Sequence, residues 1–130
     1  MVFNNFKKSF TYFLILAGLV SFTGCTQTIS IDGFDKDAWN LDKNGCEGTR
    51  DKLSFVVFSN KQKLFDTNQR AIKKLLGSPN KTQLYSRNQQ FFVYYISNGS
   101  QCNAEEENEG ATLNIRFGAL NKVNEVFIIE

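Results

Sequence analysis

The sequence predicts an α+β domain in which two helices pack on an antiparallel meander sheet of three or four strands. Three observations predict this fold. Apolar residues recur at helical spacing between residues 49 and 76, the hydrophobic period changes to two after Pro79, and short polar turns separate the alternating segments. Helices followed by a run of strands are typical of two-layer α+β architectures.

The N-terminal segment has the organisation of an export signal. Lys7 and Lys8 precede the largely apolar residues 10–20, a run too short for a membrane span, which needs about 20 apolar residues. The following sequence FTGC, residues 22–25, resembles the bacterial lipobox, in which signal peptidase II cuts before a lipidated cysteine. The resemblance implies a signal peptide over 1–24 and acylation of Cys25, for example by palmitate. The alternatives are an uncleaved anchor or a secretory signal beside an unrelated cysteine.

The residue after Cys25 is Thr26 and not aspartate, which resembles an outer-membrane address in enterobacteria-like sorting. One acyl chain binds a membrane only marginally, so a stable anchor needs two or more chains. A bacterial lipoprotein cysteine carries three. The expected location is therefore the bacterial cell envelope, lipid-anchored at the outer membrane.

The other two cysteines, Cys46 and Cys102, are expected to form a disulfide, because they are the only thiols left in an oxidising compartment. The bridge would close a loop of about 57 residues and stabilise the fold by ~4 kcal/mol in the chain-entropy model. A closed zinc site is disfavoured, since the chain contains no histidine to complete it.

The mature chain is expected to consist of a lipidated tether, residues 25–33, and a single domain, residues 34–130, with its core in 49–130. Phe34 and Trp39 stand among polar residues. Isolated aromatic side chains in a polar segment are usually buried against other apolar groups, so this segment is expected to pack against the domain.

The first predicted helix lies within residues 49–60, where Leu53, Val56 and Val57 follow helical spacing. The β-branched residues of this segment also suit a strand, and that alternative stays open.

The second predicted helix has start and stop signals. Asp66 is placed to cap it, and Gln69 stands three residues later, as in a capping box. Its apolar face consists of Ala71, Ile72, Leu75 and Leu76. Gly77 and Pro79 are expected to end it.

The strands are expected within residues 82–87, 90–97, 111–117 and 123–129, after the hydrophobic period changes to two. In 111–117, Leu113, Ile115 and Phe117 alternate with Asn114 and Arg116. A polar loop over 98–110, which carries Cys102, connects the second and third of them.

Two segments carry the resemblance to a known family. The sequence LLGSPNK, residues 75–81, ends a helix before a tyrosine-rich strand, and LNIRF is followed by NKVNEV in a hairpin. This order, over residues 49–130 with the lipobox, resembles the BamE (SmpA/OmlA) family of small outer-membrane lipoproteins. The resemblance implies two helices on a three-stranded sheet and a role in outer-membrane protein assembly. The segment from Trp39 to Cys46 is similar to a group of uncharacterised bacterial lipoproteins, whereas the BamE family has no required disulfide of this kind.

A calcium loop is one candidate metal site. Asn40, Asp42, Asn44 and Asp51 fall at positions one, three, five and twelve of a loop that has Gly45 at position six. The first residue is neutral, however, and the last is not the longer glutamate. A turn that leads into the first helix is therefore the favoured interpretation.

Composition and motifs argue against an enzyme. The five residues 105–109 (EEENE) are adjacent on a loop, where a solvated segment is favoured over a catalytic pair. The absence of histidine excludes a histidine-based triad, and no phosphate loop or cofactor motif is present. Two of the 15 Lys and Arg residues precede Cys25 and all 13 Asp and Glu follow it, so the mature chain is formally neutral and is not expected to bind nucleic acid.

The strand over 90–97 is apolar on both sides, because Phe91, Val93 and Tyr95 alternate with Phe92, Tyr94 and Ile96. Two helices can cover only one face of a small meander. The other face is expected to expose tyrosine and phenylalanine beside Asn114 or Arg116, a composition typical of binding surfaces. The segment from Phe34 to Trp39 is expected to cover part of this face, and the rest of the aromatic strip is expected to bind a partner. The candidate partner surface is Phe92, Tyr94 and Tyr95.

These observations predict a non-enzymatic accessory or adaptor protein of the envelope. It is held to the membrane by lipid and binds another envelope protein, and by the BamE resemblance it supports outer-membrane protein assembly. The alternative is a binding or inhibitor module for an envelope hydrolase, and a small enzyme is the least favoured reading.

Overall fold

The computed structural model describes residues 27–130. The expected signal peptide, residues 1–24, and the expected lipid-attachment residue, Cys25, lie outside the described residues. Within residues 27–130, no helix has the length and apolar character that crossing a membrane requires.

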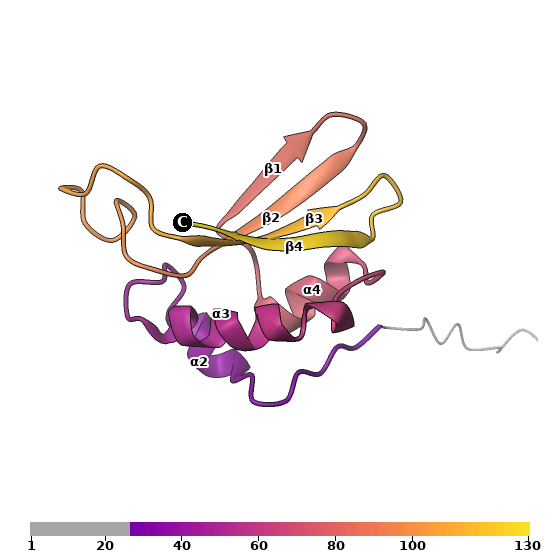
Figure 1. The fold of residues 1–130 in the computed structure, drawn as a ribbon, viewed down its shortest axis with the longest axis horizontal. Helices are drawn as coiled ribbons and strands as arrows, with labels where there is room; N and C mark the ends of the chain where they lie inside the picture. The colour runs from indigo at the N-terminus through magenta and orange to yellow at the C-terminus, as the bar shows by residue number, and fades with distance from the viewer. Residues whose placement is uncertain (1–26) are drawn as a thin grey trace, which may run out of the picture.

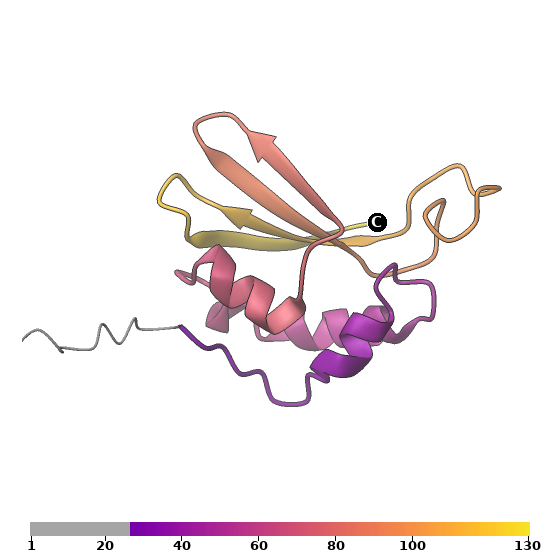
Figure 2. The ribbon, with the colours of Figure 1, turned by 180° about the vertical axis from the view of Figure 1, so that it is seen from behind.

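The described chain folds into two layers, a helical layer and a sheet (Figure 1). The sheet is a four-stranded antiparallel meander in the order β1-β2-β3-β4. Its strands are β1 (Lys81–Tyr85), β2 (Gln89–Tyr95), β3 (Thr112–Phe117) and β4 (Val123–Ile129). The helices lie against one face of the sheet, and the β1–β2 hairpin tilts away from them (Figures 1 and 2). The predicted α+β class is confirmed.

The helical layer contains one short helix in addition to the two predicted. Its elements are α2 (Lys36–Leu41), α3 (Thr49–Ser59), the 3-10 turn η1 (Lys61–Lys63) and α4 (Gln69–Leu76). The segment 49–60 is therefore a helix and not a strand. The short α2 begins at Asp35, whose side chain accepts a hydrogen bond from the Ala38 N–H at 2.9 Å.

The start of α4 differs from the prediction. Asn68, not Asp66, is the cap, and its Oδ1 accepts from the Ala71 N–H at 2.9 Å. Asp66 has φ 60° and lies in a turn before the helix, with its N–H bonded to the Val123 carbonyl. The end agrees with the prediction, because Gly77 follows Leu76 with φ 74°, a conformation that favours glycine.

The core fills the space between the two layers. Its fully buried large side chains are Trp39, Tyr94, Phe92, Phe117, Leu64, Ile72, Leu76, Leu113 and Ile115. Ile31 is also buried against this cluster, so the chain is packed from a point before residue 34, where the domain was expected to start.

A buried arginine ties the helical layer to the sheet. Arg50 of α3 is 1% exposed, and its Nε donates to the Trp39 carbonyl at 3.0 Å. Its Nη1 donates to Asn80 Oδ1, just before β1, at 2.9 Å, and the guanidinium lies 4.6 Å from the Trp39 ring centre. Burial lowers the pKa of Arg50, and nearby Asp42 opposes this shift. One side chain thus joins α2, α3 and the entry to β1.

The register of the sheet decides which face of β2 the helices cover. Phe92 pairs with Ile115 of β3, and both side chains point to the helices together with Tyr94. Phe92 and Tyr94 are 1% and 0% exposed, so their assignment to the partner surface was wrong. Trp39 packs 6.0 Å from the Tyr94 ring, on the same face. The segment from Phe34 to Trp39 was expected to cover part of the opposite face. It lies instead on the helix side of the sheet, so that prediction was wrong.

Candidate functional site

The face of the sheet that the helices leave uncovered is the candidate site. Because the strands are antiparallel and in register, alternate residues of all four strands share this face. They are Lys81, Gln83 and Tyr85 of β1, Gln89, Phe91, Val93 and Tyr95 of β2, Thr112, Asn114 and Arg116 of β3, and Glu125, Phe127 and Ile129 of β4. Aromatic, basic and amide side chains thus lie side by side.

Three aromatic rings form a row across this face, which we term the aromatic ladder: Tyr85, Phe91 and Phe127. Tyr85 meets Phe91 edge to face with ring centres 6.0 Å apart, and Phe91 meets Phe127 in the same way at 6.2 Å. Such edge-to-face pairs contribute about 0.5–1.5 kcal/mol each beyond the area they bury. Tyr85 is 66% exposed, and the two phenylalanines are half-buried. The ladder is therefore a row of packed aromatic side chains that are partly exposed to solvent.

A charged group borders the ladder. The Arg116 guanidinium lies 5.8 Å from the Phe91 ring centre and donates to Glu125 Oε2 at 3.0 Å and to Gln89 Oε1 at 3.0 Å. These bonds hold the guanidinium beside the ring. Aromatic residues and arginine are the side chains most enriched at the energetic centres of protein interfaces.

The other end of the same face carries a polar cluster of Lys81, Glu109 and Tyr95. Glu109 reaches the sheet from the loop over 98–110, where its Oε1 binds the Lys81 ammonium and accepts from the Tyr95 hydroxyl at 3.0 Å. The hydrogen bond from Lys81 lowers the pKa of Glu109, with a further contribution from Tyr95, and the same contact raises the pKa of Lys81. Tyr95 is only 7% exposed beneath them. Of the three residues predicted for the partner surface, Tyr95 alone lies on the uncovered face.

The predicted disulfide is present and holds the loop. Cys46 and Cys102 are joined, with their Cα atoms 5.7 Å apart. Gly45 has φ 70°, and a Cβ there would lie 2.9 Å from the Ile96 carbonyl carbon. A residue with a side chain at position 45 would strain the turn and press on β2. The Gly-Cys pair thus lets the turn before α3 approach the end of β2 and reach the loop.

The calcium-loop residues form a turn that leads into α3. Both carboxylate oxygens of Asp42 accept backbone N–H groups, from Glu47 at 3.0 Å and from Arg50 at 2.9 Å. The side-chain oxygen of Asn44 accepts a hydrogen bond from Asn80. Asn40 lies beside Gly77 at the end of α4. Asp51 is exposed on α3. Across residues 27–130, no three acidic or thiol side chains are grouped to hold a metal ion.

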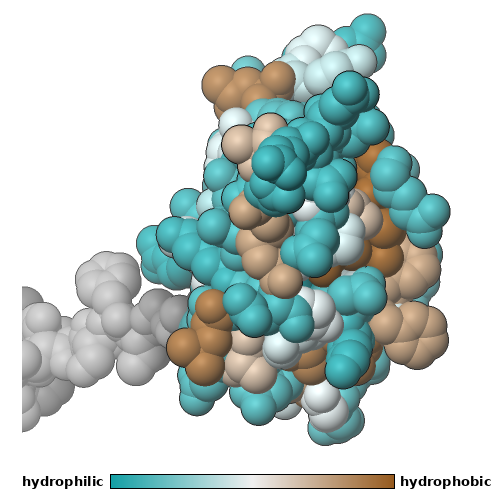
Figure 3. All heavy atoms as spheres, turned by 90° about the vertical axis from the view of Figure 1, so that its left-hand side faces the viewer, coloured by the Kyte–Doolittle hydropathy of each residue, from teal (hydrophilic) through white to brown (hydrophobic). Residues whose placement is uncertain are grey.

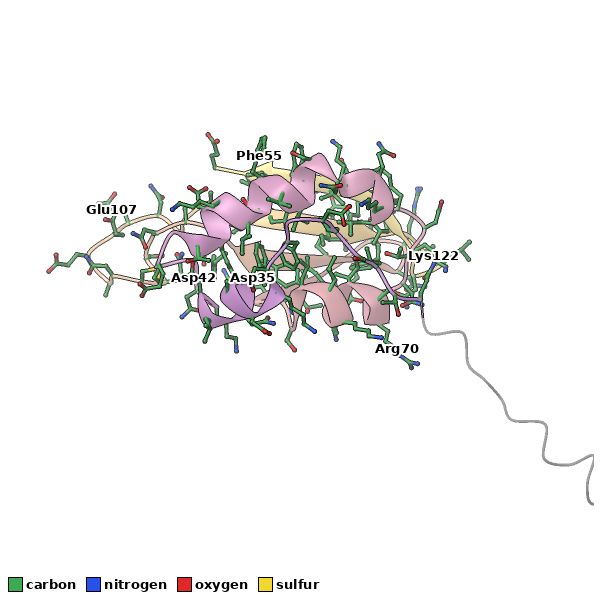
Figure 4. The ribbon with its side chains drawn as sticks, turned by 90° about the horizontal axis from the view of Figure 1, so that it is seen from below. Asp35, Asp42, Phe55, Arg70, Glu107 and Lys122 are labelled. Carbon is green, nitrogen blue, oxygen red and sulfur yellow. A yellow bond between two sulfur atoms is a disulfide. The ribbon has the colours of Figure 1, made fainter. Side chains whose placement is uncertain are left out.

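The acidic residues at 105–109 lie mostly in solvent. Glu107 stands at the tip of the loop, at the end of the molecule opposite Arg70 and Lys122 (Figure 4). Seen from the end that carries the loop, the surface is largely hydrophilic, with apolar patches between (Figure 3). Glu109 is the member of the run that contacts the sheet.

Tyr85, Phe91 and Phe127 were not among the residues predicted for the partner surface, although Arg116 was expected beside its aromatic residues and one signal could have identified Phe91. In the segment over 111–117, apolar Leu113 and Ile115 alternate with polar Asn114 and Arg116. This alternation predicts that the two apolar side chains face the core and the two polar ones face away from it. Cross-strand partners share a face, and Phe91 pairs with Arg116. The strand pairing, had it been worked out, would have placed Phe91 on the uncovered side.

No protein-family model, no curated protein and no solved structure matches this chain.

Proposed function

We propose that the protein is a lipid-anchored accessory protein of the bacterial cell envelope, which binds another envelope protein through the uncovered face of its sheet. The observation that carries the proposal is the aromatic ladder with Arg116 beside it, because ordered aromatic and guanidinium groups exposed together are typical of binding surfaces. The lipobox at residues 22–25 supports the anchor, and Thr26 supports the outer membrane.

The proposed role is binding and not catalysis. The charged side chains of the four strands on the uncovered face form ion pairs, Arg116 with Glu125 and Lys81 with Glu109. Ion pairs of this kind at an interface set the orientation and the choice of the partner. By the resemblance to BamE, the proposed partner is the machinery that assembles outer-membrane β-barrels.

The substitution Phe127→Lys is expected to weaken partner binding at least about tenfold, since it removes a ladder ring and places a charge in the contact. The measurement is a mild-detergent pull-down of the mature lipoprotein, with co-purified envelope proteins identified and quantified by mass spectrometry. Phe127 lies on an edge strand and is half-buried, so circular dichroism should retain the folded spectrum.

Phe55→Lys is the matched control. Phe55 is 70% exposed on α3, away from the uncovered face, and the change is chemically the same. We expect this variant to recover the partner in the pull-down as well as the wild type does. Equal recovery of the partner with both variants and the wild type would show that the ladder is not the binding surface.

A further inference from the structure

A pocket of about 220 Å³ opens on the uncovered face beside the aromatic ladder. Val93 and Ile129 supply apolar walls, and Lys81, Asn114, Glu109 and Glu130 supply polar ones. Val93 and Asn114 are cross-strand partners, and Asn114 pairs in turn with Phe127 of the ladder. The pocket is thus continuous with the proposed binding surface, and its volume suits one large side chain.

The pocket contains a hydrogen-bond acceptor that its own surroundings do not satisfy. Asn114 is 4% exposed, and its Nδ2 donates to the Thr112 carbonyl at 3.2 Å and to Thr112 Oγ1 at 2.9 Å. These two bonds fix the amide, and its Oδ1 accepts no hydrogen bond from residues 27–130. Every enclosed side-chain oxygen and nitrogen of the described residues has a partner, so this oxygen is reached from the pocket. It awaits a donor.

The charge around the pocket is negative. The ammonium of Lys81 is neutralised by Glu109, which also accepts from Tyr95 through the same oxygen, Oε1. Glu130 also lines the pocket, so Lys81, Glu109 and Glu130 together carry one net negative charge, and the second oxygen of Glu109 remains as an acceptor. A cation is therefore favoured over an anion.

We propose that this pocket receives a basic side chain, a lysine or an arginine, of the partner protein. The aliphatic stem lies on Val93 and Ile129, and the charged head donates to Asn114 Oδ1 and faces Glu109 and Glu130. This inference rests on the proposed function and adds the chemistry of the partner: a basic residue next to the group that packs on the aromatic ladder.

The test is an NMR titration of the ¹⁵N-labelled mature protein in detergent micelles with N-acetyl-arginine amide. The expected result is saturable movement of the Asn114 side-chain amide signals and of the Thr112 and Ile129 backbone signals. N-acetyl-citrulline amide has nearly the same shape without the charge and is expected to bind at least about threefold more weakly. Equal response to both probes, or no response to the arginine probe, would overturn the proposal.

A matched pair of variants locates the site. Glu130→Gln is expected to weaken the arginine probe about threefold, whereas Glu107→Gln, the same charge change at the loop tip, is expected to leave its affinity unchanged. Equal weakening by both variants would show a diffuse charge effect and refute the pocket. Because the titration needs no partner protein, its failure beside a successful pull-down refutes the pocket alone, and the reverse result refutes the proposed partner binding alone.

Discussion

Replacement of Trp39 with alanine is expected to lower the free energy of unfolding by about 3–5 kcal/mol. The indole is fully buried, with the Phe34 ring 5.6 Å and the Tyr94 ring 6.0 Å from its own. Its Nε1 donates to the Leu76 carbonyl, at the end of α4, at 2.9 Å. Trp39→Ala therefore opens a cavity, leaves a buried carbonyl unpaired and removes the ring under Arg50. A loss of this size is a large part of the stability of about 5–15 kcal/mol that small domains have.

Urea denaturation followed by circular dichroism measures this change. Leu41→Ala is the matched control, because Leu41 lies on the same short helix but is 87% exposed, and it should change stability by no more than about 0.5 kcal/mol. Trp39→Phe keeps most of the apolar volume and loses the N–H, so it should fall between the two. If Trp39→Ala and Leu41→Ala cost the same, α2 is not part of the core.

Removal of the disulfide by Cys46→Ser together with Cys102→Ser is expected to cost ~4 kcal/mol of unfolding free energy. The bridge joins residues 56 apart in the sequence, so it restricts the unfolded chain strongly. The loop it holds is polar and is otherwise attached through few side chains, such as Gln101, whose Nε2 donates to the Asn44 carbonyl at 3.2 Å. Without the bridge, Glu109 should also be held less firmly against Lys81.

Unfolding curves with and without dithiothreitol check this prediction. The wild type should become less stable in the reductant by about the same amount as the double variant, and the reductant should not change the double variant. Identical curves for the wild type and the double variant, both without reductant, would contradict the structural role of the bridge.

Much of the sheet and of α4 could be predicted from local chemistry. The hydrophobic period of two marks β3, the apolar and β-branched residues mark β2, and Gly77 and Pro79 end α4 because neither suits its continuation. The cap was misplaced at Asp66 because aspartate and asparagine cap helices equally well, so two candidates two residues apart cannot be separated by type. The contact of Asp66 with Val123, which is distant in sequence, decides between them.

The helical layer was less predictable, because tertiary contacts override its pattern. The six-residue α2 is too short to show a helical period, and its one buried side chain is the indole of Trp39. In α3 the buried positions are Arg50, Ser54 and Val57, whereas Phe55 is exposed. The stripe of Leu53, Val56 and Val57 predicted the helix but not its buried face, because that face includes an arginine that donates a hydrogen bond to the backbone.

An aromatic surface on the sheet was expected from the sequence, but most of the residues that form it were not identified. The sequence shows that β2 is apolar on both sides, and from this an aromatic binding surface was expected. Phe92 and Phe91 are equivalent in that pattern, and only the pairing with Ile115 or Arg116 separates the covered face from the uncovered one. The pocket could not be foreseen, because it joins Asn114 to Glu109 through a loop that the disulfide holds.

Photo-crosslinking in cells tests directly whether the uncovered face of the sheet binds the partner. The photo-crosslinker p-benzoylphenylalanine would replace Phe127 on the uncovered face in one strain and Phe55 on α3 in another, both in the full-length chain. We expect a discrete crosslinked product with one envelope protein from position 127 and none from position 55. A product from position 55 alone, or the same product from both positions, would contradict the claim that the uncovered face of the sheet binds the partner.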